Sequence, residues 1–327
     1  MTVLVTGGAG YVGSHMVLGL VDRGETPVVL DNLSTGQRGL VHENARFVEG
    51  SAGDIPLVRR LVAEHGIDAI AHFAGSIVVP DSVSDPLSYY ANNTMASRNL
   101  IEAAVASGVK NFIFSSTAAV YAGESAAPLD EGVLTDPGSP YGRSKLMTEW
   151  MLEDAARAHG LRYVALRYFN VAGADPKGRS GQVSAKATHL IKRACQAALG
   201  RISHLDIFGT DYPTADGTCV RDYIHISDLI AAHILALDYL RSGGAATVMN
   251  CGYGHGSSVR DILSAVERVV GRKLDSRERP RRAGDVPYLV SDPRLIKRTL
   301  NWVPKHDDLD EIVRGAYAWE SKLNSAA

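Results

Sequence analysis

Residues 3–13, VLVTGGAGYVG, decide the fold of this chain, because they join a short β-branched run to a helical run through glycines. Gly7 permits a tight turn, Gly10 lets the backbone approach a pyrophosphate, and Gly13 lets the helix pack closely on the strand. The pyrophosphate would lie at a helix N-terminus, where free N–H groups and the helix dipole attract anions. A plain glycine-rich turn is the alternative, but the strand before and the helix after favour a dinucleotide site.

An acidic residue ends the next apolar run, Val28-Val29-Leu30-Asp31. A carboxylate at the end of the second strand accepts hydrogen bonds from the ribose hydroxyls of a dinucleotide. It would also repel a 2′-phosphate, so Asp31 predicts NAD rather than NADP. A solvated aspartate at a strand end is the alternative, which the preceding glycine turn disfavours.

Apolar β-branched runs alternate with amphipathic runs through the first half of the chain. The expected strands are Val3–Thr6, Thr26–Leu30, Ala45–Val48, Ala69–Phe73, Asn111–Ser115 and Tyr163–Arg167. The expected helices are Tyr11–Arg23, Leu57–His65, Tyr89–Ser107 and Tyr141–His159, followed by Gly24, Gly66, Gly108 and Gly160. Strands alternating with helices imply βαβ units, and a glycine belongs just after a helix. The pattern predicts an α/β fold, a Rossmann-type doubly wound parallel sheet.

The pattern changes after Asn170. Gly173–Ser184 is polar and glycine-rich, which predicts a loop, and Lys186–Leu199 and Ser258–Val270 predict helices. Ala246–Cys251 predicts another buried strand. We therefore expect a dinucleotide-binding domain over residues 1–171 and a smaller C-terminal α/β substrate lobe over 172–327. The chain would return to the first domain around residues 220–251.

Composition narrows the function classes. The 327 residues are 45% hydrophobic and 21% charged, with 34 basic and 36 acidic side chains and a net charge of −2. This balance argues against nucleic acid or a membrane surface as a partner. Cys195, Cys219 and Cys251 form no CxxC, and the histidines form no HExxH, so we expect no metal. With no signal peptide and no membrane-spanning run, a cytoplasmic location is expected.

A tyrosine and a lysine stand four residues apart in Ser139-Pro140-Tyr141-Gly142-Arg143-Ser144-Lys145. Ser139 is a good N-cap and Pro140 a good first helical residue, so a helix should begin there with Tyr141 and Lys145 on one face. A neighbouring ammonium and an oxidised nicotinamide would lower the pKa of the phenol, making Tyr141 a general base. An exposed helix face is the alternative, which the upstream dinucleotide site disfavours.

Three residues with hydroxyl side chains, Ser115-Ser116-Thr117, end the strand that precedes this helix. Open α/β sheets bind ligands at the carboxyl ends of their strands. Thr117 could therefore hold a substrate oxygen beside Tyr141, although a turn threonine is the simpler reading of that residue alone.

These motifs, with Leu166–Asn170, resemble the extended short-chain dehydrogenase/reductase family, and within it the UDP-glucose 4-epimerases over nearly the whole chain. The run from Phe208 to Thr218, FGTDYPTADGT, and the run VRDYIH over residues 220–225 are especially typical of these epimerases. The resemblance places these residues around NAD: Gly7, Gly10, Tyr11, Val12, Gly13, Asp31, Asn32, Ser51, Ala52, Phe73, Ala74, Gly75, Asn92, Tyr141, Lys145 and Phe169. It places these residues around the UDP-sugar: Thr117, Asn170, His189, Asp206, Ile207, Phe208, Arg221, Arg282, Asp285 and Leu289.

Four positions depart from the pattern of the resembled family. Ser51 stands for an aspartate near the adenine, and Ile77 stands for a lysine near the nicotinamide ribose. His189 stands for an asparagine near the UDP phosphates. Leu289 stands for a tyrosine that narrows the sugar pocket, where small residues admit an N-acetyl group. Arg277 and Arg279, next to Arg282, are expected in a solvated basic turn.

The resemblance implies reversible C4 epimerisation of UDP-glucose and UDP-galactose through a 4-keto sugar, with hydride passing to tightly bound NAD+ and back. Tyr141 would act as the base, Lys145 would hold it ionised, and Thr117 would bond the reacting oxygen. A 4,6-dehydratase would need acids where Ala118 and Ala119 stand. A UDP-N-acetylhexosamine or UDP-pentose 4-epimerase stays open, as does a non-catalytic NAD-sensing protein. The family also implies a homodimer through the helices Tyr89–Ser107 and Tyr141–His159.

Overall fold

A computed structural model describes residues 1–121, 127–184, 188–282 and 284–325. Within this part of the chain, the main sheet has seven parallel strands in the order β11-β6-β5-β4-β1-β2-β3. The strands are β1 (Thr2–Thr6), β2 (Val28–Asp31), β3 (Arg46–Glu49), β4 (Ile67–His72), β5 (Asn111–Ser115), β6 (Arg162–Tyr168) and β11 (Thr247–Cys251). The strand order reverses between β1 and β4, where a doubly wound sheet binds ligands. The predicted Rossmann-type parallel sheet is confirmed.

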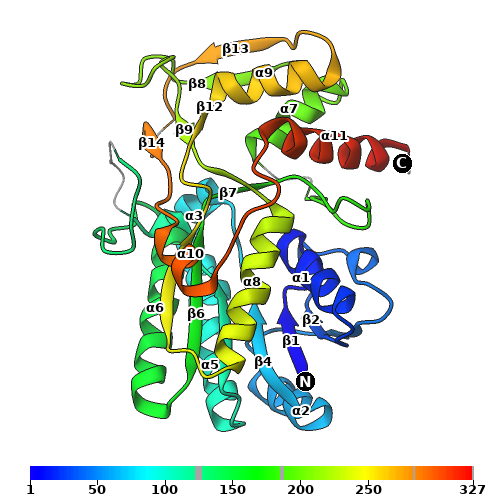
Figure 1. Cartoon of the computed structure of the whole chain (residues 1–327), viewed down its shortest axis with the longest axis vertical. Helices are drawn as coiled ribbons and strands as arrows, with labels where there is room; N and C mark the ends of the chain where they lie inside the picture. Colours follow the sequence, from blue (N-terminus) through cyan, green and yellow to red (C-terminus); the bar gives the residue numbers. More distant parts are fainter. Residues whose placement is uncertain (122–126, 185–187, 283, 326–327) are drawn as a thin grey trace.

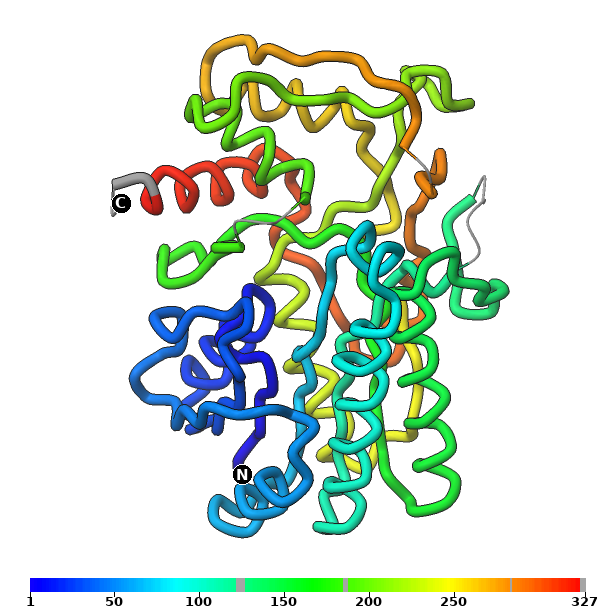
Figure 2. Tube along the Cα trace, turned by 180° about the vertical axis from the view of Figure 1, so that it is seen from behind, coloured from blue at the N-terminus to red at the C-terminus, as the bar shows by residue number. Residues whose placement is uncertain are grey.

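Helices cover both faces of this sheet (Figures 1 and 2). One layer holds α1 (Tyr11–Asp22) and α8 (Ile226–Arg241), and the other holds α2 (Ile55–His65), α5 (Ala96–Ala106) and α6 (Pro140–His159). Alternate residues of β1 pack against opposite helix layers. Val3 and Val5 pack with α1 and α8, while Leu4 packs with α2 and α5. This period-two burial on both faces explains why the strands are continuously apolar.

One expected helix is continuous but not uniformly α-helical. The helix predicted over Tyr89–Ser107 contains a π-helical segment η2 (Tyr90–Met95) between α4 (Pro86–Tyr89) and α5, and α3 (Val79–Ser84) precedes them. Asn93 accounts for the wider turn. Its side-chain amide turns inward and donates to the Ser76 carbonyl and the Ser144 hydroxyl, both at 3.0 Å. Such π segments often stand at functional sites.

The second half of the chain builds an upper lobe and a bridge to the sheet (Figure 1). Its elements are β7 (Asn170–Ala172), α7 (Leu190–Ala198), β8 (Leu205–Phe208), β9 (Val220–Arg221), β10 (Tyr223–His225), β12 (Ser257–Ser258), α9 (Val259–Val270), β13 (Ser276–Arg279), β14 (Tyr288–Leu289), α10 (Arg294–Leu300) and α11 (Leu309–Ser325); the short helices η1 (Arg38–Leu40) and η3 (Ala118–Val120) belong to the first half. Lys186 and Ala187, part of an expected helix, lie outside the described residues. Arg277 and Arg279 are exposed but lie in β13, paired with β8, so the expected basic turn is wrong.

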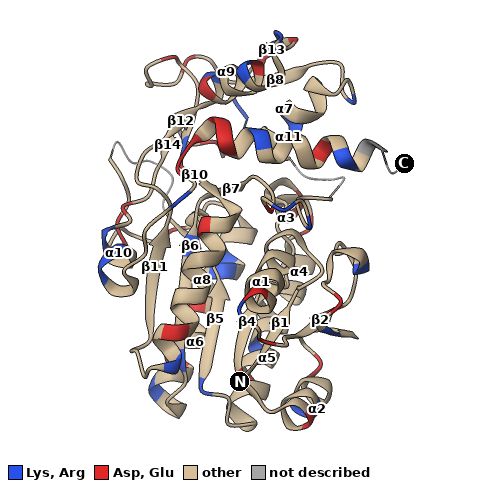
Figure 3. Ribbon diagram, turned by 45° about the vertical axis from the view of Figure 1, so that its right-hand side comes forward, with Lys and Arg blue, Asp and Glu red and all other residues tan. Residues whose placement is uncertain are grey.

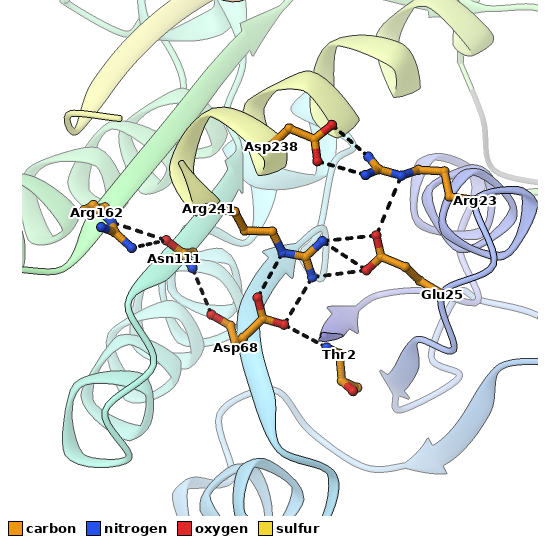
Figure 4. Close-up of polar contacts among 8 residues, drawn as sticks. All are labelled: Thr2, Arg23, Glu25, Asp68, Asn111, Arg162, Asp238 and Arg241. Carbon is orange, nitrogen blue, oxygen red and sulfur yellow. Dashed lines mark hydrogen bonds and ion pairs between the residues drawn. The ribbon is translucent and has the colours of Figure 1, made fainter. Parts of the chain in front are cut away.

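The chain re-enters the main sheet through α8 and β11. At the amino edge of the sheet, Arg241 at the end of α8 bonds Glu25 and Asp68, with N–O distances from 2.9 to 3.1 Å (Figure 4). Arg23 pairs with Asp238 on the same helix. This network fixes α8 against β1 and β4 at the edge opposite the glycine turn. The division of the chain into residues 1–171 and 172–327 stays a prediction.

Candidate active site

The glycine turn between β1 and α1 has the close geometry that its sequence predicts. Gly7 has a φ of +71°, and a Cβ added there would lie 2.6 Å from the backbone nitrogen of Ala74. A Cβ on Gly13 would lie 2.1 Å from the Gly7 carbonyl oxygen, so only glycine fits. Helix α1 begins after Gly10 with no side-chain cap. Its first N–H groups therefore point to a place suited to a pyrophosphate.

Asp31 ends β2 beside this turn and is only 7% exposed. Its carboxylate accepts hydrogen bonds from the backbone N–H groups of Ala9, at 2.9 Å, and Leu33, at 2.8 Å. An ionised carboxylate has about four acceptor sites, so capacity remains for a pair of ribose hydroxyls. The donor set at this edge fits NAD, with backbone amides for the pyrophosphate and an acid for the ribose.

Most of the other residues expected around NAD surround the same edge. Phe73 follows β4 and donates its N–H to the Thr6 carbonyl at 3.0 Å, and Ala74 and Gly75 continue that turn. Asn92 bonds the Ser76 hydroxyl at 2.8 Å, and the Ser51 hydroxyl accepts from Gly53. Tyr11 and Val12 open α1, Asn32 follows β2, and Ala52 and Phe169 are buried. Ile77, the residue expected to lack a ribose contact, is 51% exposed.

Helix α6 begins where the sequence predicts. The Ser139 hydroxyl accepts from the Gly142 N–H, and Pro140 is the first helical residue. This start places the Tyr141 phenol beside the Thr117 side chain. Lys145, one turn further, donates to the Ser115 carbonyl at 2.9 Å. Tyr141, Lys145 and Thr117 are therefore brought together at the carboxyl end of β5.

Burial governs the pKa values of this group. It raises the pKa of Tyr141 to about 12, although the Thr117 hydrogen bond lowers it, and it lowers the pKa of Lys145 to about 8. In the protein alone, desolvation outweighs the favourable contacts of the phenol. The lowering of the Tyr141 pKa that the Lys145 ammonium and a bound nicotinamide cation would produce together stays a prediction.

A second group of predicted residues gathers between β9, β14 and the loop after β13. Arg282 pairs with Asp285 at 3.0 Å, and Asp285 lies 3.9 Å from Arg221. The Arg282 guanidinium also lies over the Phe208 ring, 5.4 Å from its centroid. Two arginines beside an exposed aromatic ring suit a nucleoside diphosphate, because guanidinium binds phosphate in a bidentate fashion and a ring can stack on a base.

The remaining predicted residues are more scattered. Leu289 pairs in register with Arg221, and the Asn170 N–H bonds the Asp222 carbonyl at 2.9 Å. His189 precedes α7 and bonds Gln182 at 2.8 Å. Asp206 bonds Arg279, and Ile207 is buried in the upper lobe. The side chains of these last two residues are not brought to the arginine group.

Asp222 joins several segments through hydrogen bonds, a role that the sequence analysis missed. Its buried carboxylate accepts from the Tyr253 and Gly254 N–H groups and from both the N–H and the hydroxyl of Ser291. Its backbone meanwhile joins Asn170 and Leu289. An acidic residue among the buried side chains of VRDYIH was the available signal, since a buried carboxylate needs several donors.

Comparison with known proteins identifies the family. The model of the NAD dependent epimerase/dehydratase family matches residues 3–252. This chain belongs to that family. A UDP-glucose 4-epimerase of Azospirillum brasilense is 55% identical over 324 residues, which are 99% of this chain and 93% of that protein. Members of the family therefore resemble it over nearly the full length.

Solved structures of epimerases have the same fold. The UDP-glucose 4-epimerase of Brucella ovis, in complex with NAD, is 45% identical, with a TM-score of 0.94 over 97% of both chains. The UDP-Glc/GlcNAc 4-epimerase of Campylobacter jejuni is 44% identical, with a TM-score of 0.86 over 98% of this chain and 99% of that one.

Metal-binding groups and membrane-spanning helices are both absent from the described residues. No group of three or more His, Cys, Asp or Glu side chains could hold a metal ion there. None of the helices in that part of the chain is long and apolar enough to span a bilayer. Acidic and basic residues occur in both the sheet layer and the upper lobe of this epimerase-family chain (Figure 3).

Proposed function

We propose that this chain is an NAD-dependent UDP-glucose 4-epimerase, which interconverts UDP-glucose and UDP-galactose by inverting C4 of the sugar. The observation that carries the proposal is the grouping of Tyr141, Thr117 and Lys145 at the end of β5, where Lys145 donates to the Ser115 carbonyl at 2.9 Å. This group stands at the same sheet edge as the glycine turn. Family membership and the names of its relatives point to the same chemistry.

The cofactor would be held by backbone and side chains already described. The first turn of α1 would bind the pyrophosphate, Asp31 the adenosine ribose, and Lys145 the nicotinamide ribose. When bound, NAD+ supplies a reversible hydride acceptor whose positive ring also favours a nearby phenolate. The oxidised state is restored in each cycle, so a firmly held cofactor suits the reaction.

Tyr141 removes the proton of the sugar 4-hydroxyl and returns it after the sugar has turned. The phenolate needs a cationic neighbourhood to form near neutral pH, because burial alone raises the pKa of Tyr141 to about 12. Thr117 contacts the same oxygen and keeps it beside the phenol. Lys145 keeps the end of β5 fixed through the Ser115 carbonyl.

Arg221, Arg282 and Phe208 anchor the UDP group, so that binding energy is gained away from the reacting carbon. The sugar is then free to turn about its link to the diphosphate and present its other face. Asp285 aligns both guanidinium groups. Ala118 is buried and uncharged beside Thr117, which leaves no acid for the elimination step of a dehydratase.

A second candidate function is epimerisation of UDP-N-acetylhexosamines. Leu289 supports it, because leucine lacks the ring and hydroxyl of the tyrosine that narrows the pocket in the resembled enzymes. The Campylobacter jejuni protein is named for both UDP-Glc and UDP-GlcNAc. We propose UDP-glucose and UDP-galactose as the main substrates, with slow turnover of UDP-N-acetylglucosamine.

We also propose a homodimer. Apolar side chains are exposed on four neighbouring elements, α3, α4, η2 and α6. They are Val83 (63% exposed), Leu87 (77%), Met95 (55%) and Trp150 (53%). Exposed apolar side chains on neighbouring elements support burial against a second copy. A cytoplasmic location is proposed as well, supported by three cysteines that are free and buried.

The test is incubation of purified protein with UDP-galactose, without added NAD, followed by product analysis. UDP-glucose should accumulate to an equilibrium mixture, and Tyr141→Phe should abolish most of the turnover. A wild-type protein that leaves UDP-galactose unchanged, with or without added NAD, would refute the proposed function.

A further inference from the structure

Side chains of helix α6 contact three successive residues at the end of β5. Ser115 accepts from Lys145 through its carbonyl, Ser116 donates its hydroxyl to Glu149 at 2.5 Å, and the Thr117 side chain lies beside the Tyr141 phenol. The three partners on α6 stand at positions 141, 145 and 149, which share one helix face. The first two already belong to the proposed catalytic group, whereas Glu149 does not.

Glu149 is a buried carboxylate with a strong partner. Its side chain is 4% exposed, and that of Arg167 on β6 is 7% exposed. The Arg167 guanidinium donates to both carboxylate oxygens, with distances from 2.6 to 3.2 Å. A buried pair of this kind gains little stability over an apolar pair, so a role in fixing geometry is the better reason for its presence.

Further hydrogen bonds hold the pair in one arrangement. Arg167 also donates to the Tyr121 hydroxyl at 3.1 Å, and that hydroxyl donates to Asn250 on β11 at 2.6 Å. Tyr121 ends the short helix that follows Thr117, so the segment after β5 is fixed at both ends. The carboxylate of Glu149 therefore cannot shift without moving several buried groups.

We propose that Glu149, supported by Arg167, is a positioning residue for the epimerisation: it holds the Ser116–Thr117 turn so that the Thr117 hydroxyl stays against the Tyr141 phenol. The inference rests on the proposed catalytic roles of Tyr141 and Thr117. Glu149 contacts the turn directly through Ser116, and its other hydrogen bonds come from Arg167.

The test uses Ser116→Ala rather than a change of Glu149, since removing that carboxylate would leave a buried guanidinium unpaired. In Ser116→Ala the carboxylate keeps Arg167, and only the link to the turn is lost. Thr148→Val is the matched control. Thr148 is 1% exposed on the same helix, and its hydroxyl donates to the Ser144 carbonyl of that helix.

We expect kcat of Ser116→Ala to fall about 10- to 100-fold, since small misplacement of a reacting group is costly. KM for UDP-galactose and NAD content should stay at the wild-type values, because the UDP and cofactor sites are untouched. Thr148→Val should keep the wild-type kcat. Circular dichroism and the melting temperature confirm that both variants are folded.

A pH profile separates positioning from a merely structural role. The Thr117 hydrogen bond lowers the pKa of the Tyr141 phenol, so loosening it should raise that pKa. The base works ionised, so the acid limb of the kcat profile should move to higher pH in Ser116→Ala but not in Thr148→Val. Ultraviolet titration of each protein against its Tyr141→Phe partner follows the same phenol without turnover.

The outcomes are distinct. A Ser116→Ala protein with wild-type kcat and an unmoved acid limb overturns the positioning role, while the proposed function stands. An active Tyr141→Phe protein, or a wild-type protein without epimerase activity, overturns the proposed function and this inference with it. A lowered kcat with a shifted limb in Ser116→Ala alone supports the role of Glu149.

Discussion

Replacing Leu289 with tyrosine should narrow the sugar site and remove the activity on UDP-N-acetylglucosamine. Leu289 lies in β14, in register with Arg221, and packs with the buried residues that follow Thr117. That cluster contains Ala118, Val120, Tyr121, Leu129, Leu146 and Phe169. Because these buried residues fill the space on one side of Leu289, the longer tyrosine side chain must extend toward the sugar.

The magnitude follows from the cost of forcing extra atoms into a filled space. Overpacking typically costs about 1–3 kcal/mol. At about 1.4 kcal/mol per tenfold, the ratio of kcat/KM for UDP-N-acetylglucosamine to that for UDP-galactose should fall by about 5- to 140-fold. The kcat/KM for UDP-galactose itself should change little, since the smaller hexose leaves room for the ring.

The assay measures both kcat/KM values by product analysis in wild type and Leu289→Tyr. Leu134→Tyr is the control, because Leu134 is 72% exposed and receives the same ring on the surface. If wild type shows no trace of the second activity, or if Leu289→Tyr keeps the wild-type ratio, Leu289 is core packing beside the pocket and not the gate.

Three further predictions follow from other residues. Denatured protein should release NAD and not NADP, because Asp31 would repel a 2′-phosphate; chromatography of the supernatant checks this, and recovered NADP would contradict it. Burial lowers the pKa of His233 to about 4, whereas the unfolded value is near 6.5, so the unfolded chain alone takes up a proton and stability falls as pH drops between these values. Between pH 7 and 5, the free energy of unfolding measured with denaturant should fall by about 2 kcal/mol more in wild type than in His233→Phe; equal losses would refute the assignment. Trp150→Asp should convert a dimer to a monomer in light scattering, and a wild-type monomer at micromolar concentration would rule out the dimer.

Local sterics explain why much of the fold could be predicted. The turn depends on the positive φ of Gly7 and on the approach of Gly13 to the Gly7 carbonyl, both within a few residues, so the glycines alone indicate it. The start of α6 depends on Ser139 and Pro140, which act within one turn. The alternation of strands and helices then leaves a doubly wound parallel sheet as the natural solution.

Features that depend on distant contacts could not be predicted. The π segment follows from Asn93, whose partners Ser76 and Ser144 are 17 and 51 residues away. The strand β13 exists because it pairs with β8, about seventy residues earlier, and its charged sequence gives no period-two apolar signal.

In the site, too, features set by nearby residues could be predicted and features set by distant contacts could not. Tyr141 and Lys145 were found from their spacing, yet the pKa of Tyr141 depends on burial, which spacing does not report. Glu149 was missed because a glutamate in a helix usually lies at the surface. Its role depends on Arg167 on another element, which only the structure brings within 2.6 Å.

The central claim is that hydride leaves C4 of the sugar and returns to the same carbon within one active site. The most direct test supplies UDP-galactose with deuterium at C4 to the purified protein in ordinary water, with no added NAD. The account predicts UDP-glucose that keeps the deuterium at C4 in full. Loss of the label to water, or no conversion at all, would contradict it.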